Sequence, residues 1–286
     1  MRPAAFGWNA ETAASNAFQS RPAGADVAAQ ALREFDGLVA ALDAAGVGTV
    51  VVPDTPVPVK PDAVFPNNWF STHPDGSVVL YPMEAANRRL ERRRDVLEKV
   101  LGTGRFIDLS PLEQDNQFLE GTGSLIIDHA RLQAWASLSS RTHPQAIAEF
   151  TKRTGIAVHS FRTADPHGRP YYHTNVLLSL GERFAVFCPA ALPDPAERKA
   201  VADGIAATRE LIELTPEQVG AFAANILELR SSRGHPVIAL SATARRSLTA
   251  PQLRRLHSQG EIVALPIPTI ETVGGGSVRC MLAELY

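Results

Sequence analysis

The sequence predicts an α/β protein in which short strands and amphipathic helices alternate along the whole chain. Three observations support this class: apolar strand-like runs recur throughout the 286 residues, helical apolar stripes separate them, and the order strand, strand, helix, strand repeats four or five times. No linker rich in Gly, Ser or charge interrupts the pattern, so we expect one domain over 1–286. Strands at this density exclude a helical bundle, but they do not separate a propeller from a barrel or an open sheet.

The first long helix is predicted over 26–45. Its apolar residues recur at helical spacing, Asp26 is placed to cap its start, and Gly46 is placed to end it. The apolar run 49–52 follows as a buried strand, which Pro53 closes. Several prolines then hold the chain extended up to residue 70.

The remaining elements follow the same rules. Apolar runs bounded by turn residues predict strands over 77–81, 106–109, 125–128, 132–138, 157–161, 176–180, 184–187, 210–214, 226–229, 237–241 and 261–266. Helical periodicity and start signals predict helices over 84–101, 144–153, 195–208, 216–222 (capped by Thr215) and 251–259. A tight turn is expected over 120–124. A last strand-like run, 277–285, follows three consecutive glycines.

Composition limits the classes of function. The net charge is −2 and the chain has no basic block, which argues against nucleic acid and anionic membranes as partners. No apolar run approaches the roughly 20 residues that cross a bilayer. The N-terminus lacks the apolar core of a signal peptide. Two cysteines make no disulfide framework, so we expect a cytoplasmic protein, with Cys188 as plain core.

A nucleophile is the sharpest chemical prediction. Cys280 follows the glycine loop that contains Gly275, Gly276 and Ser277, where a thiol is well placed to attack a substrate. The backbone N–H groups of this loop are expected to stabilise oxyanion charge during the reaction. The alternative is a buried cysteine that only fills space. His173 and Glu120 supply an acid–base and a carboxylate that orients it, and this set needs no metal or cofactor. No histidine pair has metal-ligand spacing, so a zinc site is not expected.

Polar residues near strand ends suggest how a substrate is held. Asn67 and Asn68, in the proline-braced segment that starts near Asp62, offer amide donors and acceptors that suit a neutral amide or urea, although an Asx turn is the common alternative. Arg88 and Arg141 are candidates for gripping a carboxylate, and Arg141 at a strand end is the stronger of the two.

In this order, the motifs resemble those of the guanidine-modifying superfamily of arginine deiminases, dimethylarginine hydrolases and amidinotransferases. The resemblance rests on Gly-Gly-Gly-Ser-Val-Arg-Cys-Met (274–281), Glu120-Gly121, His173-Thr174-Asn175, Pro61-Asp62-Ala63-Val64-Phe65, Leu138-Ser139-Ser140-Arg141-Thr142 and Asn87-Arg88-Arg89. The segments 4–9 and 65–73 are similar to the citrulline-utilisation hydrolases of that superfamily. The resemblance implies a five-bladed α/β propeller (pentein fold) with pseudo-fivefold repeats, a central site, and Cys280, His173 and Glu120 as its catalytic residues.

Two departures from the family pattern predict the substrate. In guanidine-binding relatives the position of Asn68 is acidic, and arginine deiminases also carry an acid at the position of Asn175. Those carboxylates pair with a cationic guanidinium, whereas a neutral ureido group would leave them without a counter-charge. We therefore expect hydrolysis of citrulline to ornithine, carbon dioxide and ammonia.

The resemblance also implies a thiocarbamate on Cys280 during the reaction, no cofactor, a small amino-acid substrate and a possible homodimer. The alternatives are arginine deimination, dimethylarginine hydrolysis, and a non-catalytic binding protein on the same fold. The last is exemplified by a ribosome anti-association factor, and it predicts loss of the Cys/His/Glu set that this chain keeps.

Overall fold

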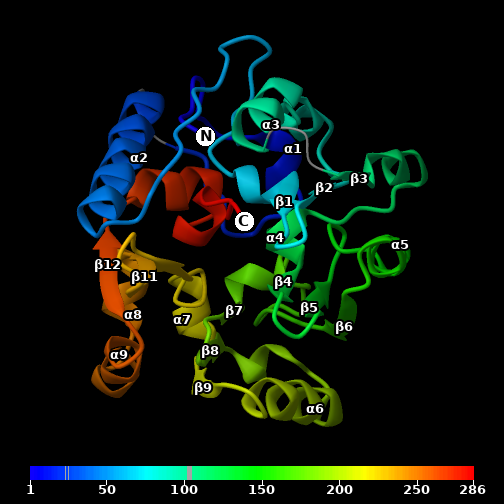
Figure 1. Ribbon diagram of the computed structural model, residues 1–286, viewed down its shortest axis with the longest axis vertical. Coiled ribbons are helices and arrows are strands. Elements are labelled where there is room, and N and C mark those ends of the chain that lie inside the picture. Colours follow the sequence, from blue (N-terminus) through cyan, green and yellow to red (C-terminus); the bar gives the residue numbers. More distant parts are fainter. Residues whose placement is uncertain (23, 25, 102–104) are drawn as a thin grey trace.

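The structure, a computed structural model, describes residues 1–22, 24, 26–101 and 105–286. Its strands form four separate three-stranded sheets arranged around a common centre (Figure 1). In every sheet the first strand is antiparallel to the second, and the second is parallel to the third. A parallel pair needs a long crossover, and helices supply it between the second and third strands. The repeated unit is therefore strand, strand, helix, strand.

The four sheets and their crossover helices follow one another along the chain. The strands are β1 Phe70–Thr72, β2 Ser77–Leu80, β3 Arg105–Asp108, β4 Ile126–Asp128, β5 Gln133–Leu138, β6 Ala157–Arg162, β7 Leu178–Leu180, β8 Phe184–Phe187, β9 Glu210–Glu213, β10 Leu227–Arg230, β11 Pro236–Ser241 and β12 Glu261–Leu265. The crossovers are α3 Arg94–Leu101, α5 Pro144–Thr154, α6 Pro195–Ala206, and the pair α8 Ala242–Ser247 and α9 Ala250–His257.

Four other helices of the described chain lie outside these units. α1 Ala10–Ala13 and α2 Val27–Ala44 precede the first unit, whereas α4 Gly121–Ser124 and α7 Pro216–Gly220 lie between units. Short 3-10 turns occur at Pro66–Asn68, Ala86–Glu91, Ser110–Asp115, Thr174–Val176, Pro189–Ala191 and Val278–Met281, and a π turn at Ile270–Gly274. Four of the 3-10 turns, Pro66–Asn68, Ala86–Glu91, Thr174–Val176 and Val278–Met281, carry predicted site residues.

The fifth unit of the propeller is divided between the two ends of the chain. Helix α2 packs against β12, and Arg2 forms a parallel bridge with Pro53. The C-terminal segment enters the centre of the molecule (Figure 1). Within the described residues this unit contains no regular sheet. The predicted α/β class and its repeats are confirmed, with four regular blades and one irregular one.

Several predicted elements differ from the structure. The run 49–52 is not a regular strand, and the side chain of Val50 is 58% exposed. The N-terminal segment beside this run makes only a single bridge, Arg2 to Pro53, and no ladder of strand hydrogen bonds in the described chain. The run 277–285 begins as the 3-10 turn Val278–Met281 and continues without regular structure. The predicted helix 84–101 is a 3-10 turn followed by α3. The predicted turn 120–124 contains the one-turn helix α4.

Of the two predictions for the ends of α2, the cap by Asp26 is wrong and the end at Gly46 is confirmed. The side chain of Asp26 makes no capping bond and lies instead 3.5 Å from Arg33. Gly46 does end the helix, with φ +77°, a conformation that glycine adopts without strain. Thr215 caps α7 through a capping box, as predicted.

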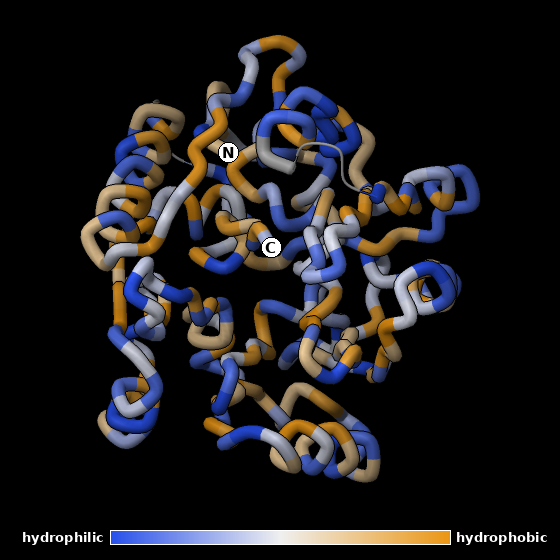
Figure 2. The backbone as a smooth tube through the Cα atoms, in the orientation of Figure 1, coloured by the Kyte–Doolittle hydropathy of each residue, from blue (hydrophilic) through white to orange (hydrophobic). Residues whose placement is uncertain are grey.

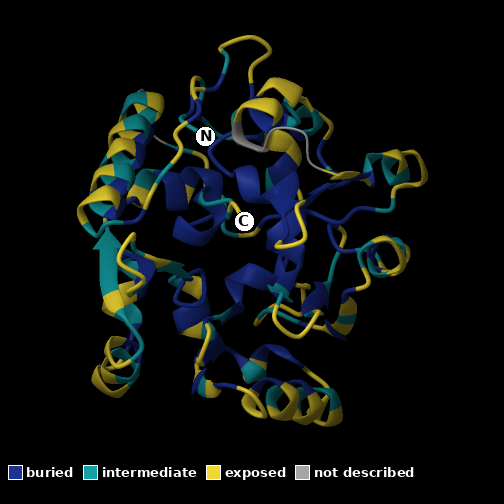
Figure 3. Ribbon diagram, in the orientation of Figure 1, coloured by how far each residue is buried: buried dark blue, intermediate teal, exposed yellow. Residues whose placement is uncertain are grey.

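Burial follows the arrangement of the blades. Figure 3 shows that the central strands and turns are buried, whereas the crossover helices expose their outer faces. Along α2 and α6 polar and apolar residues alternate, as expected for helices with one buried face (Figure 2). In the described ranges, no helix is both long and apolar enough to cross a bilayer.

Phe150 anchors α5 on the sheet β4–β5–β6. It is fully buried and its ring stacks on Tyr81 with the ring centroids 6.2 Å apart. We expect Phe150→Ala to lower the free energy of unfolding by about 3–5 kcal/mol, because it removes a buried ring and leaves a cavity. Urea denaturation measures this change. Gln145→Ala, at an exposed position of the same helix, is the control and is expected to change stability by less than about 0.5 kcal/mol.

Candidate active site

A small buried cavity at the centre of the molecule collects most of the predicted site residues. It is lined by Thr12, Asn16, Asp62, Phe65, Asn68, Arg88, Arg141, Tyr172, His173, Gly274, Gly275, Gly276 and Cys280. Its volume is about 10 Å³, which corresponds to room for about one water molecule. The predicted nucleophile, the predicted base and both arginines thus share one closed space. Glu120, Asn67, Asn175 and Ser277 are not among the lining residues.

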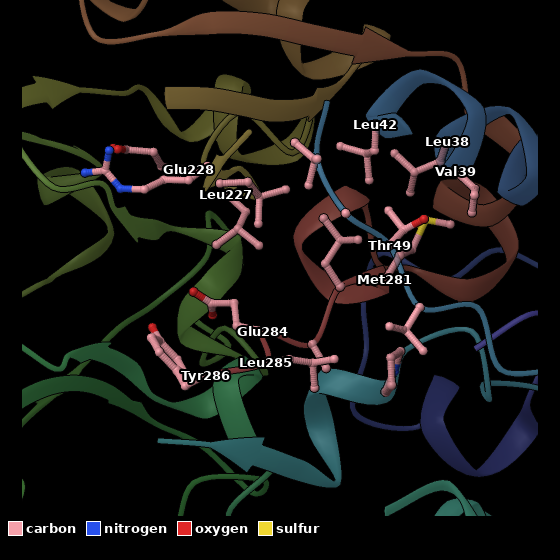
Figure 4. A pocket seen from close by; sticks show the side chains of 18 of the residues that line it. Leu38, Val39, Leu42, Thr49, Leu227, Glu228, Met281, Glu284, Leu285 and Tyr286 are labelled. Atoms are coloured by element: carbon pink, nitrogen blue, oxygen red, sulfur yellow. The ribbon is translucent and has the colours of Figure 1, made fainter. Parts of the chain in front are cut away.

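A larger hollow lies elsewhere. A cleft of about 640 Å³ runs between α2, β10 and the C-terminal segment, and Leu38, Leu42, Leu227 and Met281 line it (Figure 4). Neither Cys280 nor His173 nor Glu120 contributes to this cleft. Its walls are mainly apolar side chains without a convergent set of reactive groups. We therefore place the candidate site in the small cavity.

Glu120 is a fully buried carboxylate beside His173. Its Oε1 accepts a hydrogen bond from the N–H of Glu84 (3.0 Å), and its Oε2 lies 2.9 Å from His173 Nε2 and 3.4 Å from Arg141 Nη1. Burial opposes the charged form of Glu120, but Arg141, His173 and Arg88 outweigh burial and hold its pKa well below the ordinary range. Glu120 is therefore ionised at neutral pH.

The charge of Glu120 fixes the tautomer of His173. Burial holds the pKa of His173 below its ordinary value; Glu120 opposes this shift, and Arg141 and Arg88 add to it. The imidazole is therefore neutral at pH 7. Because an ionised carboxylate can only accept, Nε2 carries the proton and donates to Glu120, and Nδ1 keeps a free lone pair. In the described chain, Nδ1 has no hydrogen-bond partner and is available as a base.

Two glycines after Glu120 allow this close approach. A Cβ at Gly123 would lie 2.6 Å from Asn68 Nδ2 and 2.7 Å from His173 Nδ1. Gly121 has φ +49°, and a Cβ there would lie 2.3 Å from the carbonyl oxygen of Asn67. The Glu-Gly-Thr-Gly motif is thus required because α4 packs directly under the base and under the turn Pro66–Asn68.

Cys280 lies on the turn Val278–Met281, and only 3% of its surface is exposed. Its sulfur accepts hydrogen bonds from two side-chain amides, Asn175 Nδ2 at 3.4 Å and Asn225 Nδ2 at 3.2 Å. Amide N–H groups aimed at sulfur suit an anionic thiolate better than a thiol. The other cysteine, Cys188, is fully buried in the apolar core, as predicted.

The glycine loop is held on both sides. The carbonyl of Gly275 accepts from Asn16 Nδ2 (3.2 Å) and from the hydroxyl of Tyr172 (2.5 Å), and Ser277 Oγ donates to Glu271 (2.7 Å). The N–H of Gly275 donates to the carbonyl of Glu271. Gly275 therefore has no N–H left for an oxyanion, which removes it from the predicted donors and leaves Gly276 and Ser277.

Within the described residues, Asp62, Asn67 and Asn68 each have an unpaired buried polar atom, but the amide nitrogen of Asn67 is bonded to α4. Asp62 Oδ2 accepts from Asn9 (2.7 Å) and Thr12 (3.0 Å), while its buried Oδ1 has no partner in the described chain. Burial raises the pKa of Asp62, and Arg88 with the two hydrogen bonds offsets part of this shift. Asn68 Nδ2 is also buried without a partner. Asn67 instead donates to Thr122 (3.2 Å) and ties its turn to α4.

Arg88 is mostly engaged within the protein. It donates to both oxygens of Glu91 (2.9 and 2.8 Å), to Asn68 Oδ1 (2.7 Å) and to the carbonyl of Phe65 (3.1 Å). One Nη1 hydrogen remains, so Arg88 cannot form a two-pronged grip on a carboxylate without breaking these bonds. Burial raises the pKa of Glu91 to about 7, even though Arg88 favours its charged form.

Arg141 is held by the N-terminal segment that covers the cavity. Its Nη2 donates to the carbonyl of Thr12 (2.8 Å) and to Ser15 Oγ (2.9 Å), and its Nε lies 3.2 Å from Glu84. Its guanidinium also lies over the ring of Tyr172, 5.1 Å from the centroid.

Asn225, Glu91 and Tyr172 are site residues that the sequence analysis missed. For Asn225 a signal existed: it lies two residues before β10, as Asn68 lies two residues before β1. For Glu91, three residues after Arg88, helical spacing is the signal. Nothing in the sequence marks Tyr172 apart from its position beside His173.

We expect Glu120→Gln to lower the pKa of His173 further, because it removes the anion that stabilises the imidazolium. NMR titration of the imidazole resonance measures this. The wild-type imidazole is expected to titrate below the ordinary value of about 6.5. Glu113→Gln, which removes a carboxylate that pairs with Arg92 outside the cavity, is the control and should leave the titration unchanged. A higher pKa in Glu120→Gln would contradict the assigned negative charge of Glu120.

Comparison with solved structures shows the fold. The N-terminal domain of ArgZ bound to its substrate, an arginine dihydrolase from the ornithine-ammonia cycle in cyanobacteria, superposes with a TM-score of 0.76 at 17% identity, over 98% of this chain and 94% of that one. The complex of an AgrE variant with L-arginine gives 0.71 at 19% identity, over 89% and 35%. An adduct of dimethylarginine dimethylaminohydrolase gives 0.63 at 15% identity, over 90% and 92%. These proteins are pentein-fold members of the superfamily that the motifs resemble.

No curated protein sequence matches the chain. The family model of the eukaryotic N,N dimethylarginine dimethylhydrolases, however, matches residues 2–286, almost the whole sequence. With the fold shared with other pentein hydrolases, this match establishes the family: the chain belongs to the N,N dimethylarginine dimethylhydrolase family of the pentein superfamily.

Proposed function

We propose that this protein is a cysteine hydrolase that splits the ureido group of citrulline, giving ornithine, carbon dioxide and ammonia. The observation that carries the proposal is the pair of amides at Asn68 and Asn175. Asn68 lies beside the base and Asn175 touches the nucleophile, and both are buried. In the guanidine-binding relatives that the motifs resemble, the position of Asn68 is acidic, and arginine deiminases also carry an acid at the position of Asn175.

Electrostatics supports a neutral reacting group. A guanidinium in this cavity would lie next to the neutral amides of Asn68 and Asn175, which cannot balance its positive charge. The three buried carboxylates, Asp62, Glu91 and Glu120, are instead next to Arg88 or Arg141. A ureido group carries N–H donors and a carbonyl acceptor. The unpartnered Asn68 Nδ2 and Asn175 Oδ1 offer one donor and one acceptor to match it.

The α-amino-acid end of the substrate has its own partners. Arg141 is proposed to bind the α-carboxylate in place of Thr12 and Ser15, with the remaining Nη1 hydrogen of Arg88 as a second donor. The unpartnered Oδ1 of Asp62 is proposed to accept from the α-ammonium. Because the cavity holds about one water, binding requires the segment around residues 12–16 to move outward.

The first half of the proposed reaction forms a covalent intermediate. His173 Nδ1 takes the proton of Cys280, and the thiolate attacks the ureido carbon. The N–H groups of Gly276 and Ser277 are the proposed donors to the oxyanion. The carbon–nitrogen bond to the terminal NH₂ breaks, and the imidazolium of His173 donates its proton to the departing ammonia. A thiocarbamate remains on Cys280.

The second half regenerates the enzyme. Neutral His173 takes a proton from water, and the hydroxide adds to the thiocarbamate carbon. The carbon–sulfur bond breaks, Cys280 leaves as thiolate and takes the proton back from the imidazolium of His173, and the released carbamic acid loses carbon dioxide to give ornithine. Glu120 stays ionised in both halves and holds the protonated Nε2 of His173 in place.

The second candidate is a guanidino substrate. The family name refers to dimethylarginine, and ArgZ is described as an arginine dihydrolase, so arginine or a methylarginine is the nearest rival substrate. The same nucleophile and base would serve it. A non-catalytic binding protein is the rival of another class, and the Cys280–His173–Glu120 set argues against it.

The first test is product analysis with citrulline, arginine and dimethylarginine in parallel. We expect ornithine and ammonia from citrulline alone. Cys280→Ser should lower turnover by about a thousandfold or more, because the hydroxyl is a much weaker nucleophile. Calorimetry should show that this variant still binds citrulline. Near-normal turnover in Cys280→Ser would rule out the covalent mechanism, and citrulline as the product from arginine would rule out the proposed substrate.

Substrate choice is tested by Asn68→Asp and Asn175→Asp. Each variant supplies a carboxylate for a guanidinium and leaves it unpaired opposite a ureido group. We expect the ratio of kcat/KM for arginine to that for citrulline to rise by at least about tenfold, equivalent to about 1.4 kcal/mol. Asn67→Asp is the matched control, since the amide nitrogen of Asn67 is bonded to Thr122 and not to the sulfur or beside the base, and it should leave the ratio unchanged. An unchanged ratio in the first two variants would show that these amides do not select the substrate.

A further inference from the structure

Asn225 contacts the nucleophile from outside the cavity. It is fully buried, lies two residues before β10, and points its amide nitrogen at Cys280 Sγ, 3.2 Å away. The same Nδ2 also donates to the carbonyl of Asn175 at 3.1 Å. Its two amide hydrogens are thus shared between the sulfur and the turn Thr174–Val176, which carries the other amide that touches the sulfur.

The contact is not a by-product of ordinary core packing. Asn225 Oδ1 and Asn175 Oδ1 are both buried without a partner in the described chain. An unpaired buried acceptor is destabilising, and apolar residues of similar volume would avoid that cost. A buried amide whose only side-chain partner is a reactive sulfur is better explained by the sulfur's chemistry than by the stability of the fold.

We propose that Asn225 is a positioning residue for the nucleophile: its amide donates to Cys280 and fixes the turn of Asn175, so that two donors converge on one sulfur. The proposal rests on the use of Cys280 as nucleophile in the proposed function and adds a residue to that site. Asn225 does not line the cavity and acts on the substrate only through Cys280.

The physical basis is the solvation of the sulfur. Cys280 is almost completely buried, so water cannot stabilise its thiolate. Two amide donors replace that water, and a hydrogen bond to a charged group is stronger than one to a neutral group.

The test is the ionisation of the sulfur in Asn225→Ala and Asn225→Asp, measured without substrate. The ultraviolet absorbance of the thiolate is followed against pH. The absorbance of the same protein carrying Cys280→Ser in addition is subtracted, which removes the contributions of Cys188 and the tyrosines. We expect the thiolate fraction at neutral pH to fall by up to about tenfold in both variants, since each loses a charge-assisted donor. Asn225→Asp keeps the volume of the side chain, so a volume effect alone would leave its titration unchanged.

Gln218→Ala is the control for loss of stability. Gln218 is buried and donates to the carbonyl of Ser247 and to Gln252, away from the sulfur. It should lower the Tm without moving the thiolate titration. An unchanged titration in both Asn225 variants would overturn the proposal, as would a change in Asn225→Asp alone, which would indicate only repulsion. A shift in both variants of an enzyme that does not hydrolyse citrulline would support the role of Asn225 and refute only the substrate.

Discussion

The candidate site depends on one buried negative charge, Glu120. Desolvation opposes this charge, and the fold overcomes the cost with a backbone N–H, Arg141 and the imidazole of His173. Because Glu120 stays ionised, His173 must donate from Nε2 and keep its lone pair on Nδ1. Loss of the charge would leave Arg141 without one partner and the base without a defined tautomer. The glycines that follow Glu120 are fixed by the same constraint, since α4 packs within contact distance of the base.

The propeller explains why residues far apart in the sequence meet. Each blade begins with a short turn that leads into its first strand, and these turns surround the centre of the molecule (Figure 1). Asn68, Asn175 and Asn225 lie in or directly after such turns, before β1, β7 and β10. Cys280 takes the corresponding place in the irregular fifth unit. Because the blade is repeated around the centre, polar residues from several blades lie close to the sulfur of Cys280 and to His173.

Under the proposed function, substrate selectivity depends on which polar atoms of the site lack partners. Most charged groups are already paired, as Arg88 is with Glu91, so they contribute to the electrostatic potential of the cavity more than they contact a ligand. Among the predicted site residues and Asn225, buried polar atoms without a partner in the described chain belong to Asp62, Asn67, Asn68, Asn175 and Asn225. A neutral planar group with donors and acceptors uses such atoms well, whereas a cation gains little from amides. The N-terminal segment completes the enclosure, and its contacts with Arg141 resemble those that a substrate carboxylate would make.

The sequence by itself determined the α/β class, the repeated unit, most strand positions and the candidate residues Cys280, His173 and Glu120, because periodicity, turn chemistry and motif order are local properties of the chain. Local signals also misled: the apolar run 49–52 reads as a strand, yet strand formation needs a partner that the fifth unit does not supply. Only the tertiary structure decided that Arg88 is committed to Glu91, that Gly275 has no free N–H and that Asn225 reaches Cys280. Each of these depends on distances between segments that are remote in sequence, which no local pattern encodes.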